Sequence, residues 1–460
     1  MKISRPGRLT FATLSLTTMA LAPVLAQDGS GLRGVLSFSQ GVEYSDNPTL
    51  AVTSPGSEFL SVTDLGFSLS SETRTQSFSL SLGTSLEGSI GSSTTALDDF
   101  GFANSEAAVS YAREGANSTL SFRANYREID IVDDIFGFFV DGEFDPDALI
   151  IDGGVRESFG VSGRYEFGVD GPFGLDLRAR HNVTNYVGVT DPDLEDKDRT
   201  RVDATARFRI NPALTARAVA GYNRSDTEDA LSTSRRNNYV GAGVEVETAG
   251  GMNYTGDITL DQTETFELGA LASDDSGVGI SLGAMLDRSN GYIGFDISSR
   301  IDDSGRRNTA SVSRSFDLSN GALFLSLGVA EQDGSDTELT TRVSYTREYS
   351  DSILQADVIQ RPSTSDGDAF LNSSIRINFM KEINEISSWD AGFSYGSASV
   401  FGEPDGDTRT SATVAYSRDL TEDWTLRAGV EVVQIDDDGG ADRSSNTVFV
   451  NIGRDFSFGF

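Results

Sequence analysis

Long segments of this chain alternate between apolar and polar residues with a period of two. In residues 200–210 every second side chain is apolar, and the positions between are Arg, Asp or Thr. Residues 118–126 and 424–432 repeat the pattern. Successive side chains of a strand point to opposite faces, so this alternation predicts strands with one apolar and one polar face. No stretch of comparable length shows the helical period of about 3.6 residues. We expect an all-β protein.

The alternating segments are too long for an ordinary soluble sheet. We count about 22 of them, accept 18 to 24, and find most to be about 10–14 residues long. Strands of soluble proteins average about 5–6 residues. A tilted strand needs about 9–11 residues to cross a bilayer. The lengths therefore favour a single transmembrane antiparallel up-and-down β-barrel.

The connections between the segments alternate between short and long. The gaps after even-numbered segments are all brief, whereas residues 45–57, 130–153, 187–199 and 263–276 form longer gaps after odd-numbered ones. Short periplasmic turns and longer extracellular loops are typical of outer-membrane barrels. An even strand number then places both termini on the periplasmic side.

The N-terminus has the organisation of an export signal. Basic residues within the first eight positions precede the mostly apolar residues 9–22, and the small residue Ala26 follows. This order predicts a signal peptide over 1–26 and a barrel domain over 27–460. A membrane anchor is the alternative, but the apolar run is shorter than the ~20 residues that span a bilayer. Only Gln27 to Gly31 would precede the first strand, so we expect no N-terminal plug domain.

The composition excludes several kinds of chemistry. The chain has no cysteine and one histidine, which rules out disulfide scaffolds, thiolate metal sites and most histidine catalysis. It carries 36 basic and 70 acidic residues, which rules out a basic nucleic-acid binder. We interpret His181 as an interfacial side chain near the outer end of its strand. We expect no enzymatic activity, no catalytic residue and no cofactor.

Acidic clusters in the long loops are candidate cation sites. Carboxylate oxygens suit Ca²⁺ or Mg²⁺, although no loop has the EF-hand spacing. The alternative is a solvated acidic surface. The candidate ligands are Asp133, Asp134, Asp141, Glu143, Asp145, Asp436, Asp437 and Asp438.

The loop 130–153 also contains many apolar residues, among them Val132, Phe136, Phe139 and Ile150. An apolar set of this size is unfavourable in open water. The loop could fold into the lumen, pack on the rim or extend two strands outward. Our hypothesis is an inward-folded constriction loop whose carboxylates favour cations.

The polar parity of the strands identifies candidate residues for the lumen. Mixed charge on this face can set the selectivity of a pore, or the charges can simply neutralise each other along the wall. The candidates are Arg123, Arg127, Arg164, Arg178, Arg207, Arg209, Arg217, Asp203, Glu245, Asp296, Arg376, Arg427 and Glu431.

A basic residue two positions before an apolar one recurs in the C-terminal half. The series is Arg314, Arg347, Lys381, Arg418 and Arg454. These residues share the parity of the apolar face. A lipid-facing Arg costs about 2–4 kcal/mol at the bilayer midplane but only about 0–1 near the interface. We therefore expect them at the periplasmic boundary, reaching toward the headgroups.

Two short motifs resemble bacterial outer-membrane barrels. The chain ends with Phe456, Phe458 and Phe460 in alternation, which is similar to the assembly signal of such barrels. Residues 41–50 (Gly-Val-Glu-Tyr-Ser-Asp-Asn-Pro-Thr-Leu) and the turn 415–424 resemble the porin-like β-barrel families of proteobacteria. The resemblance implies a Gram-negative outer membrane and, as partners, its lipid, lipopolysaccharide and the barrel-assembly machinery.

Taken together, these features predict a porin-like channel that passes small hydrophilic solutes or ions passively, with a mild cation preference. One alternative is a structural or surface-interaction barrel with a closed lumen. Another is an outer-membrane component of exopolysaccharide export or secretion.

Deletion of Phe460 tests the assembly signal. We expect the deletion to reduce insertion into the outer membrane, because the motif ends on this aromatic ring. The measurement is the fraction of heat-modifiable barrel in outer-membrane fractions, compared with the full-length chain. Normal insertion of the shortened chain would contradict the assignment.

Overall fold

A computed structural model shows an all-β chain. It describes residues 31–90, 101–132, 139–140, 143–144, 149–150, 152–168, 171–365, 367–403, 406–437 and 440–459. None of these residues belongs to a helix long and apolar enough to cross a membrane. The predicted signal peptide lies outside the described residues.

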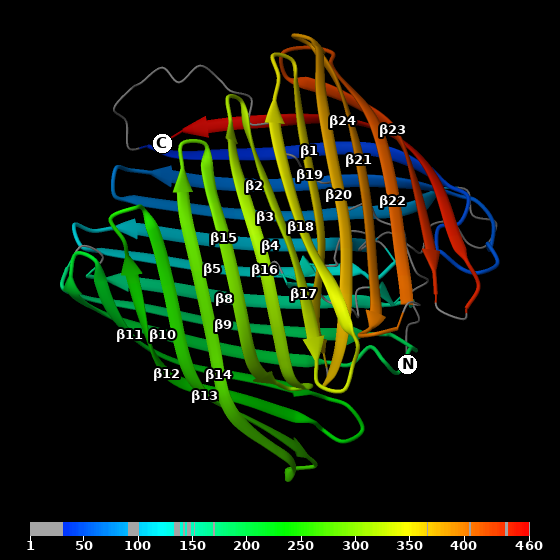
Figure 1. Ribbon diagram of the computed structural model, residues 1–460. Helices are drawn as coiled ribbons and strands as arrows, with labels where there is room; N and C mark the ends of the chain where they lie inside the picture. Colours follow the sequence, from blue (N-terminus) through cyan, green and yellow to red (C-terminus); the bar gives the residue numbers. More distant parts are fainter. Residues whose placement is uncertain are drawn as a thin grey trace.

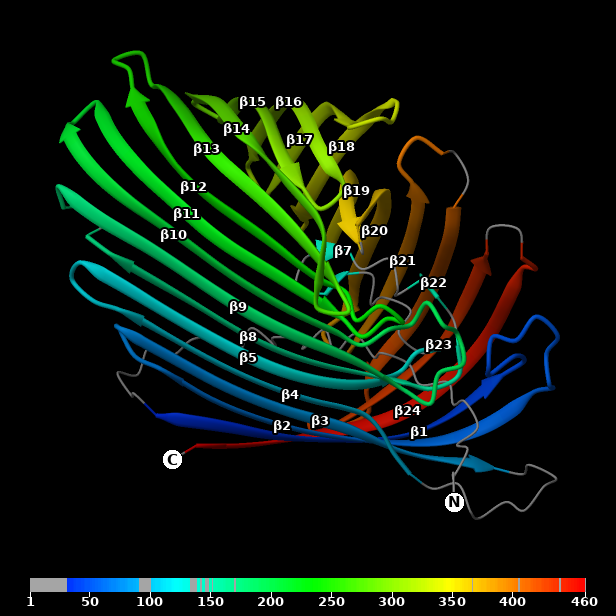
Figure 2. The same cartoon turned by 90° about the horizontal axis from the view of Figure 1, so that it is seen from below.

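The strands form one closed antiparallel barrel. Its sheet has 22 strands, each paired with its neighbours along the chain, and β1 pairs with β24 to close the ring. Figure 1 shows the red β24 beside the blue β1, and Figure 2 shows the strands inclined around the wall. Two further strands, β6 and β7, form a small separate hairpin. The predicted fold class and strand number are confirmed.

The 22 strands of the barrel are long, from 12 residues in β15 to 19 in β14. Their bounds are β1 Leu32–Ser45, β2 Glu58–Glu72, β3 Gln76–Ile90, β4 Gly101–Glu114, β5 Ser118–Asp130, β6 Phe139–Val140, β7 Glu143–Phe144, β8 Val155–Phe167, β9 Phe173–Val187, β10 Lys197–Asn211, β11 Leu214–Thr227, β12 Ser234–Glu247, β13 Met252–Glu267, β14 Ala270–Arg288, β15 Gly291–Asp302, β16 Gly305–Leu318, β17 Gly321–Gln332, β18 Thr337–Glu348, β19 Ser352–Ser365, β20 Asp368–Asn384, β21 Ser387–Val400, β22 Gly406–Asp419, β23 Trp424–Asp436 and β24 Arg443–Gly459.

One predicted loop is wrong. Residues 263–276 are mostly strand, because β13 and β14 continue to a tight turn at Leu268 and Gly269, both with positive φ. The segment is polar at most positions, and its side chains include Glu264, Asp274 and Asp275. Alternation is lost where a hairpin extends past the bilayer and both of its faces meet water. The period-two criterion therefore detects only the part of a strand that faces lipid.

The apolar parity of each strand faces outward. On β10 the exposed apolar side chains are Val202, Phe208 and Ile210, while the residues between them are charged or polar. The pattern holds across the closing pair, where Val448 and Val450 of β24 are exposed beside Val42 of β1. A barrel with an apolar exterior and fully paired strands satisfies the requirement that lipid sets for a backbone.

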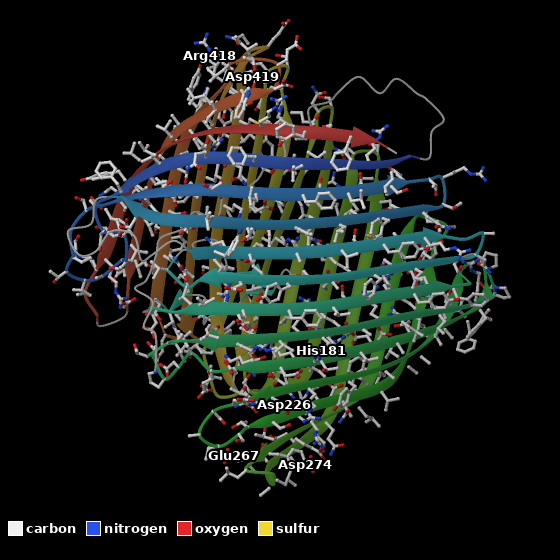
Figure 3. All side chains as sticks on the ribbon, turned by 180° about the vertical axis from the view of Figure 1, so that it is seen from behind. His181, Asp226, Glu267, Asp274, Arg418 and Asp419 are labelled. Carbon is white, nitrogen blue, oxygen red and sulfur yellow. The ribbon has the colours of Figure 1, made fainter. Side chains whose placement is uncertain are left out.

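The basic residues before the turns face outward at one end of the barrel. Arg314, Arg347 and Arg454 each lie over the aromatic ring two residues later, at 4.5–5.2 Å from its centroid. Arg454 also pairs with Asp423 at 2.9 Å. Figure 3 shows Arg418 at the end of the barrel opposite to Asp274. The outward orientation of these residues agrees with the prediction, and their position at the headgroups stays a prediction.

The seam between β1 and β24 contains a close contact across the outer face. Gly34 pairs with Phe458, and the Phe458 ring occupies the space that a Cβ at Gly34 would need. The ring also stacks on Phe67 of β2, with 6.4 Å between the ring centroids. The glycine thus lets an aromatic side chain of the last strand cover the first strand.

A bulky residue at Gly34 should weaken this seam. We expect Gly34→Ile to displace the Phe458 ring and destabilise the folded barrel by about 1–3 kcal/mol, the usual cost of overpacking. The measurement is the urea midpoint of the folded barrel. Gly163→Ile is the matched control, because Gly163 faces outward with its nearest neighbouring atom 3.8 Å from the Cβ position. Equal midpoints for the two variants would contradict the seam argument.

Candidate functional site

The predicted lumen residues all lie on the inward face of the wall. The strand register places them opposite one another in rows, out of phase with the exposed apolar residues. Several contacts link strands that are not direct neighbours, such as Arg217 to Asp257 at 3.6 Å and Tyr239 to Asp203 at 2.7 Å. Side chains on the concave side of a barrel converge, which makes such contacts possible.

One buried carboxylate holds three arginines on the wall formed by β8, β9 and β10. Asp176 is 4% exposed and accepts hydrogen bonds from Arg164 and Arg178 at 3.0 and 2.9 Å. Arg207 approaches the same carboxylate at 3.7 Å. Arg164 also pairs with Glu166 at 2.5 Å. The arginines outnumber the carboxylates here, so the cluster retains positive charge.

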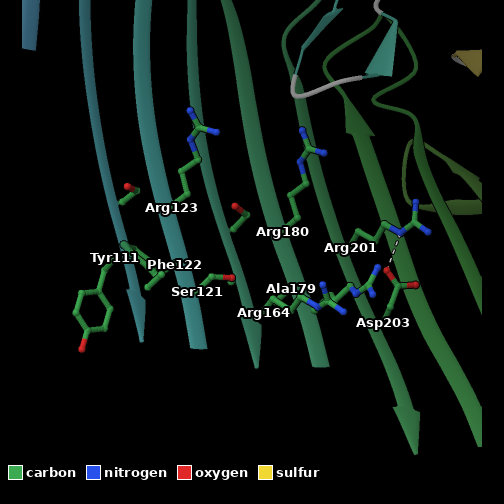
Figure 4. A pocket seen from close by; sticks show the side chains of 14 residues that line it. Tyr111, Ser121, Phe122, Arg123, Arg164, Ala179, Arg180, Arg201 and Asp203 are labelled. Atoms are coloured by element: carbon green, nitrogen blue, oxygen red, sulfur yellow. Dashed lines mark hydrogen bonds and ion pairs between the residues drawn. The ribbon is translucent and has the colours of Figure 1, made fainter. Parts of the chain in front are cut away.

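A second group lies beside this cluster. Arg201 donates to Asp203 at 2.8 Å, and the Tyr239 hydroxyl donates to the same carboxylate. Arg180 lies directly opposite Arg201 across the β9–β10 pair. Figure 4 shows Arg123, Arg180 and Arg201 pointing to the same side of the wall, away from Tyr111. A cavity of about 640 Å³ lies on this side.

Charge on the far side of the ring is more balanced. Arg427 of β23 makes a bidentate pair with Asp390 of β21, at 2.6 and 2.8 Å. Arg376 of β20 lies opposite Asp357 of β19. Glu245 accepts a hydrogen bond from Asn253 at 3.2 Å, and Asp296 faces inward near Gly283. These candidates lie along the wall in separate small groups.

The loop after β5 returns to the inside of the barrel. Val132 packs with Leu50, Val433 and Ile435, all of them at most 3% exposed. The guanidinium of Arg409, on β22, donates to the Val132 carbonyl at 3.1 Å. Val433 shares the inward parity of Glu431, so this loop end rests on the inner wall and not above the rim. The remaining prediction of a constriction depends on residues 133–138, 141–142, 145–148 and 151, which lie outside the described residues.

The acidic candidates for a cation site are only partly described. Asp437 pairs with Arg443 at 2.5 Å, which places a competing positive charge on that carboxylate, and Asp436 ends β23. Within the described part of the chain, no three side chains of His, Asp or Glu lie close enough to hold a metal ion. Asp133, Asp134, Asp141, Asp145 and Asp438 lie outside the described residues, as does the side chain of Glu143.

His181 lies on the outward face of β9. Its Nδ1 is 2.9 Å from the Thr200 hydroxyl and 3.3 Å from a carboxylate oxygen of Asp198. The side chain is 42% exposed, and Figure 3 shows it between the two ends of the barrel. The outward orientation agrees with the prediction, and the interfacial position stays a prediction.

Two cavity residues were missing from the prediction. Arg180 and Arg201 line the cavity together with the predicted Arg123, Arg164 and Arg178. Parity alone would have found them, because each lies two positions from a predicted lumen residue. Arg409 also faces inward and was not predicted.

Two of the long loops are joined through Asp152. Its carboxylate accepts hydrogen bonds from the Gly153 and Asp191 N–H groups at 2.7 and 2.6 Å, from the Thr190 hydroxyl at 2.9 Å, and from the Thr190 N–H. Burial would raise the pKa of Asp152, but these donors outweigh it and hold the pKa below its usual value. The contact therefore fixes the loop before β8 against the loop before β10.

Comparisons with known proteins support the fold. No protein-family model and no curated protein matches the chain. The FrpB iron transporter from Neisseria meningitidis is similar at a TM-score of 0.56 and 9% identity, over 94% of this chain and 83% of that one. The ferric-catecholate import receptor Fiu from E. coli K12 is similar at 0.54 and 11%, over 94% and 82%. The siderophore receptor PirA from Acinetobacter baumannii is similar at 0.53 and 8%, over 94% and 81%. The chain thus shares its barrel fold with outer-membrane receptors.

Neutralising Asp152 should loosen the loop contact. A carboxylate with a lowered pKa stabilises the folded contact fully above its ordinary pKa, and this contribution is lost as the pH falls through the lower pKa of the folded state. At pH 7 we therefore expect Asp152→Asn to speed hydrogen exchange at the Thr190 and Asp191 amides by about fivefold. Asp193→Asn, in the same loop, is the control. Equal exchange in wild type and Asp152→Asn at pH 7 would refute the contact.

Proposed function

We propose that this protein is an outer-membrane channel for small hydrophilic solutes. The observation that carries the proposal is the solvent exposure of charged side chains inside a closed barrel. The side chains of Arg178 and Arg201 face inward and are 56% and 55% exposed. Charged side chains this exposed are stable only beside water, so the lumen is proposed to be water-filled.

The outer surface supports the location. An apolar exterior with arginine–aromatic pairs at one end matches a barrel embedded in a bilayer. The similar solved structures are outer-membrane receptors and transporters, which supports a transport barrel. Their identity to this chain is only 8–11%, so the siderophores and iron in their names are not transferred to it. The predicted signal peptide and the barrel-assembly partner belong to this proposal.

The basic side chains on the inner wall argue against the expected cation preference. The mild cation preference was expected from the carboxylates of an inward-folded loop 130–153. Inside the barrel, however, the strands β5, β8, β9, β10 and β11 present more basic than acidic side chains. Charged side chains that line a lumen act directly on a permeating ion. We therefore do not propose a cation preference.

Conductance in a planar bilayer tests the proposed function. We expect the refolded mature chain to give steady single-channel currents, because a water-filled lumen carries ions down a salt gradient. The reversal potential then reports the preferred sign of charge. A barrel that is heat-modifiable on a gel but electrically silent would overturn the channel and favour a closed barrel. A heat-denatured sample is the control for leakage.

A further inference from the structure

The positive charge of the lumen is concentrated on five adjacent inner faces. The inward residues of β5, β8, β9, β10 and β11 include twelve basic side chains but three acidic ones, a difference of nine charges. The acidic residues are Glu166, Asp176 and Asp203. The basic residues are Arg123, Arg127, Arg156, Arg164, Arg178, Arg180, Lys197, Arg199, Arg201, Arg207, Arg209 and Arg217. This excess is opposite in sign to the net charge of the whole chain.

Part of this wall has the form of a cradle. Arg123, Ser162, Arg180 and Arg201 are successive cross-strand partners on β5, β8, β9 and β10. Neighbouring strands lie about 4.8 Å apart, so the backbones of Arg123 and Arg180 are about 10 Å apart with the small Ser162 between them. Two long basic side chains therefore lie on either side of a short one. Figure 4 shows Arg123 and Arg180 pointing to the same side of the sheet.

The next row adds two more arginines at the same cavity. Ser121, Arg164, Arg178 and Asp203 are successive partners across the same four strands. All of the residues in the two rows line the cavity of about 640 Å³. The volume lies within the usual 300–1,000 Å³ of small-molecule sites.

Amide groups close the other edge of the cradle. Gly160 lies between Asn125 and Asn182, and a Cβ there would meet their Oδ1 atoms at 2.8 and 3.0 Å. Glycine thus lets both amide side chains lean over β8. An amide carries both a donor and an acceptor group, so this edge of the cradle is polar but uncharged.

Arg180 and Arg201 lie directly opposite each other across β9 and β10, and this pairing of like charges calls for an explanation. Like charges opposite one another on a sheet are destabilising. Guanidinium groups bind carboxylate and phosphate oxygens in pairs of parallel hydrogen bonds, and such a ligand would relieve the repulsion. The geometry therefore favours a ligand with several oxygens and more than one negative charge over a monovalent ion such as chloride.

We propose that this cradle binds small solutes carrying a multivalent oxyanion, such as a phosphate or pyrophosphate group. The inference deepens the proposed channel function and rests on it, since the site lies in a water-filled lumen. It names the solute class by the chemistry of the wall: anionic, oxygen-rich and small.

Titration calorimetry with inorganic pyrophosphate tests the site directly. The folded mature chain in detergent should bind sodium pyrophosphate saturably, and sodium acetate at least about tenfold more weakly. The double variant Arg123→Gln/Arg180→Gln should lose about tenfold or more in affinity. Arg342→Gln is the matched control, because this inward arginine lies on β18, outside the cradle, and should bind within about twofold of wild type.

Two further measurements distinguish an effect of the variants on folding from an effect on binding. The urea midpoint of each variant is measured beside that of wild type, so that a loss of pyrophosphate binding is distinguished from a loss of folding. Pyrophosphate should also reduce the chloride current of wild type, and the double variant should resist this block. Binding without conductance would uphold the site and overturn the channel. Conductance with unaltered pyrophosphate affinity in the double variant, or an equal loss in Arg342→Gln, would overturn the site.

Discussion

Every feature of this protein depends on the closure of its backbone hydrogen bonding. In lipid, an unpaired N–H or C=O costs several kcal/mol, so a sheet can cross only as a ring without edges. The pairing of β1 with β24 supplies that closure, and Gly34 allows Phe458 to cover the seam. Once the ring is closed, alternate side chains of each strand face outward and inward. This alternation decides which charged side chains meet inside the barrel.

The division lets an acidic chain carry a basic wall. The net charge describes the molecule as a whole, but parity and strand order decide which charges meet in the lumen. The buried Asp176 holds arginines in place while leaving an excess of positive charge. Arg180 lies directly opposite Arg201 across β9 and β10. The positive charge of the lumen is therefore a property of one arc of the wall and cannot be read from composition.

Much of the fold was predictable because lipid imposes a simple rule on sequence. Where strands cross the bilayer, alternation identified them, their number and the residues that face inward. Alternation did not identify the strand residues from Glu264 to Asp275, because there both faces of the hairpin meet water and neither needs apolar side chains. The contact of Arg409 with Val132 could not be predicted, because it joins residues 277 positions apart and depends on the path of a loop. Arg180 and Arg201 were predictable by parity, but their convergence at one cavity depends on the register.

The central claim is that alternate residues of a strand face a water-filled lumen and lipid. Because the chain has no cysteine, single cysteines can be introduced without background. The most direct measurement is the labelling of Thr205→Cys and Ala204→Cys, neighbours on β10, by a charged membrane-impermeant thiol reagent in proteoliposomes. The account predicts rapid labelling at 205 and protection at 204. Equal labelling at both, or protection at 205, would contradict it.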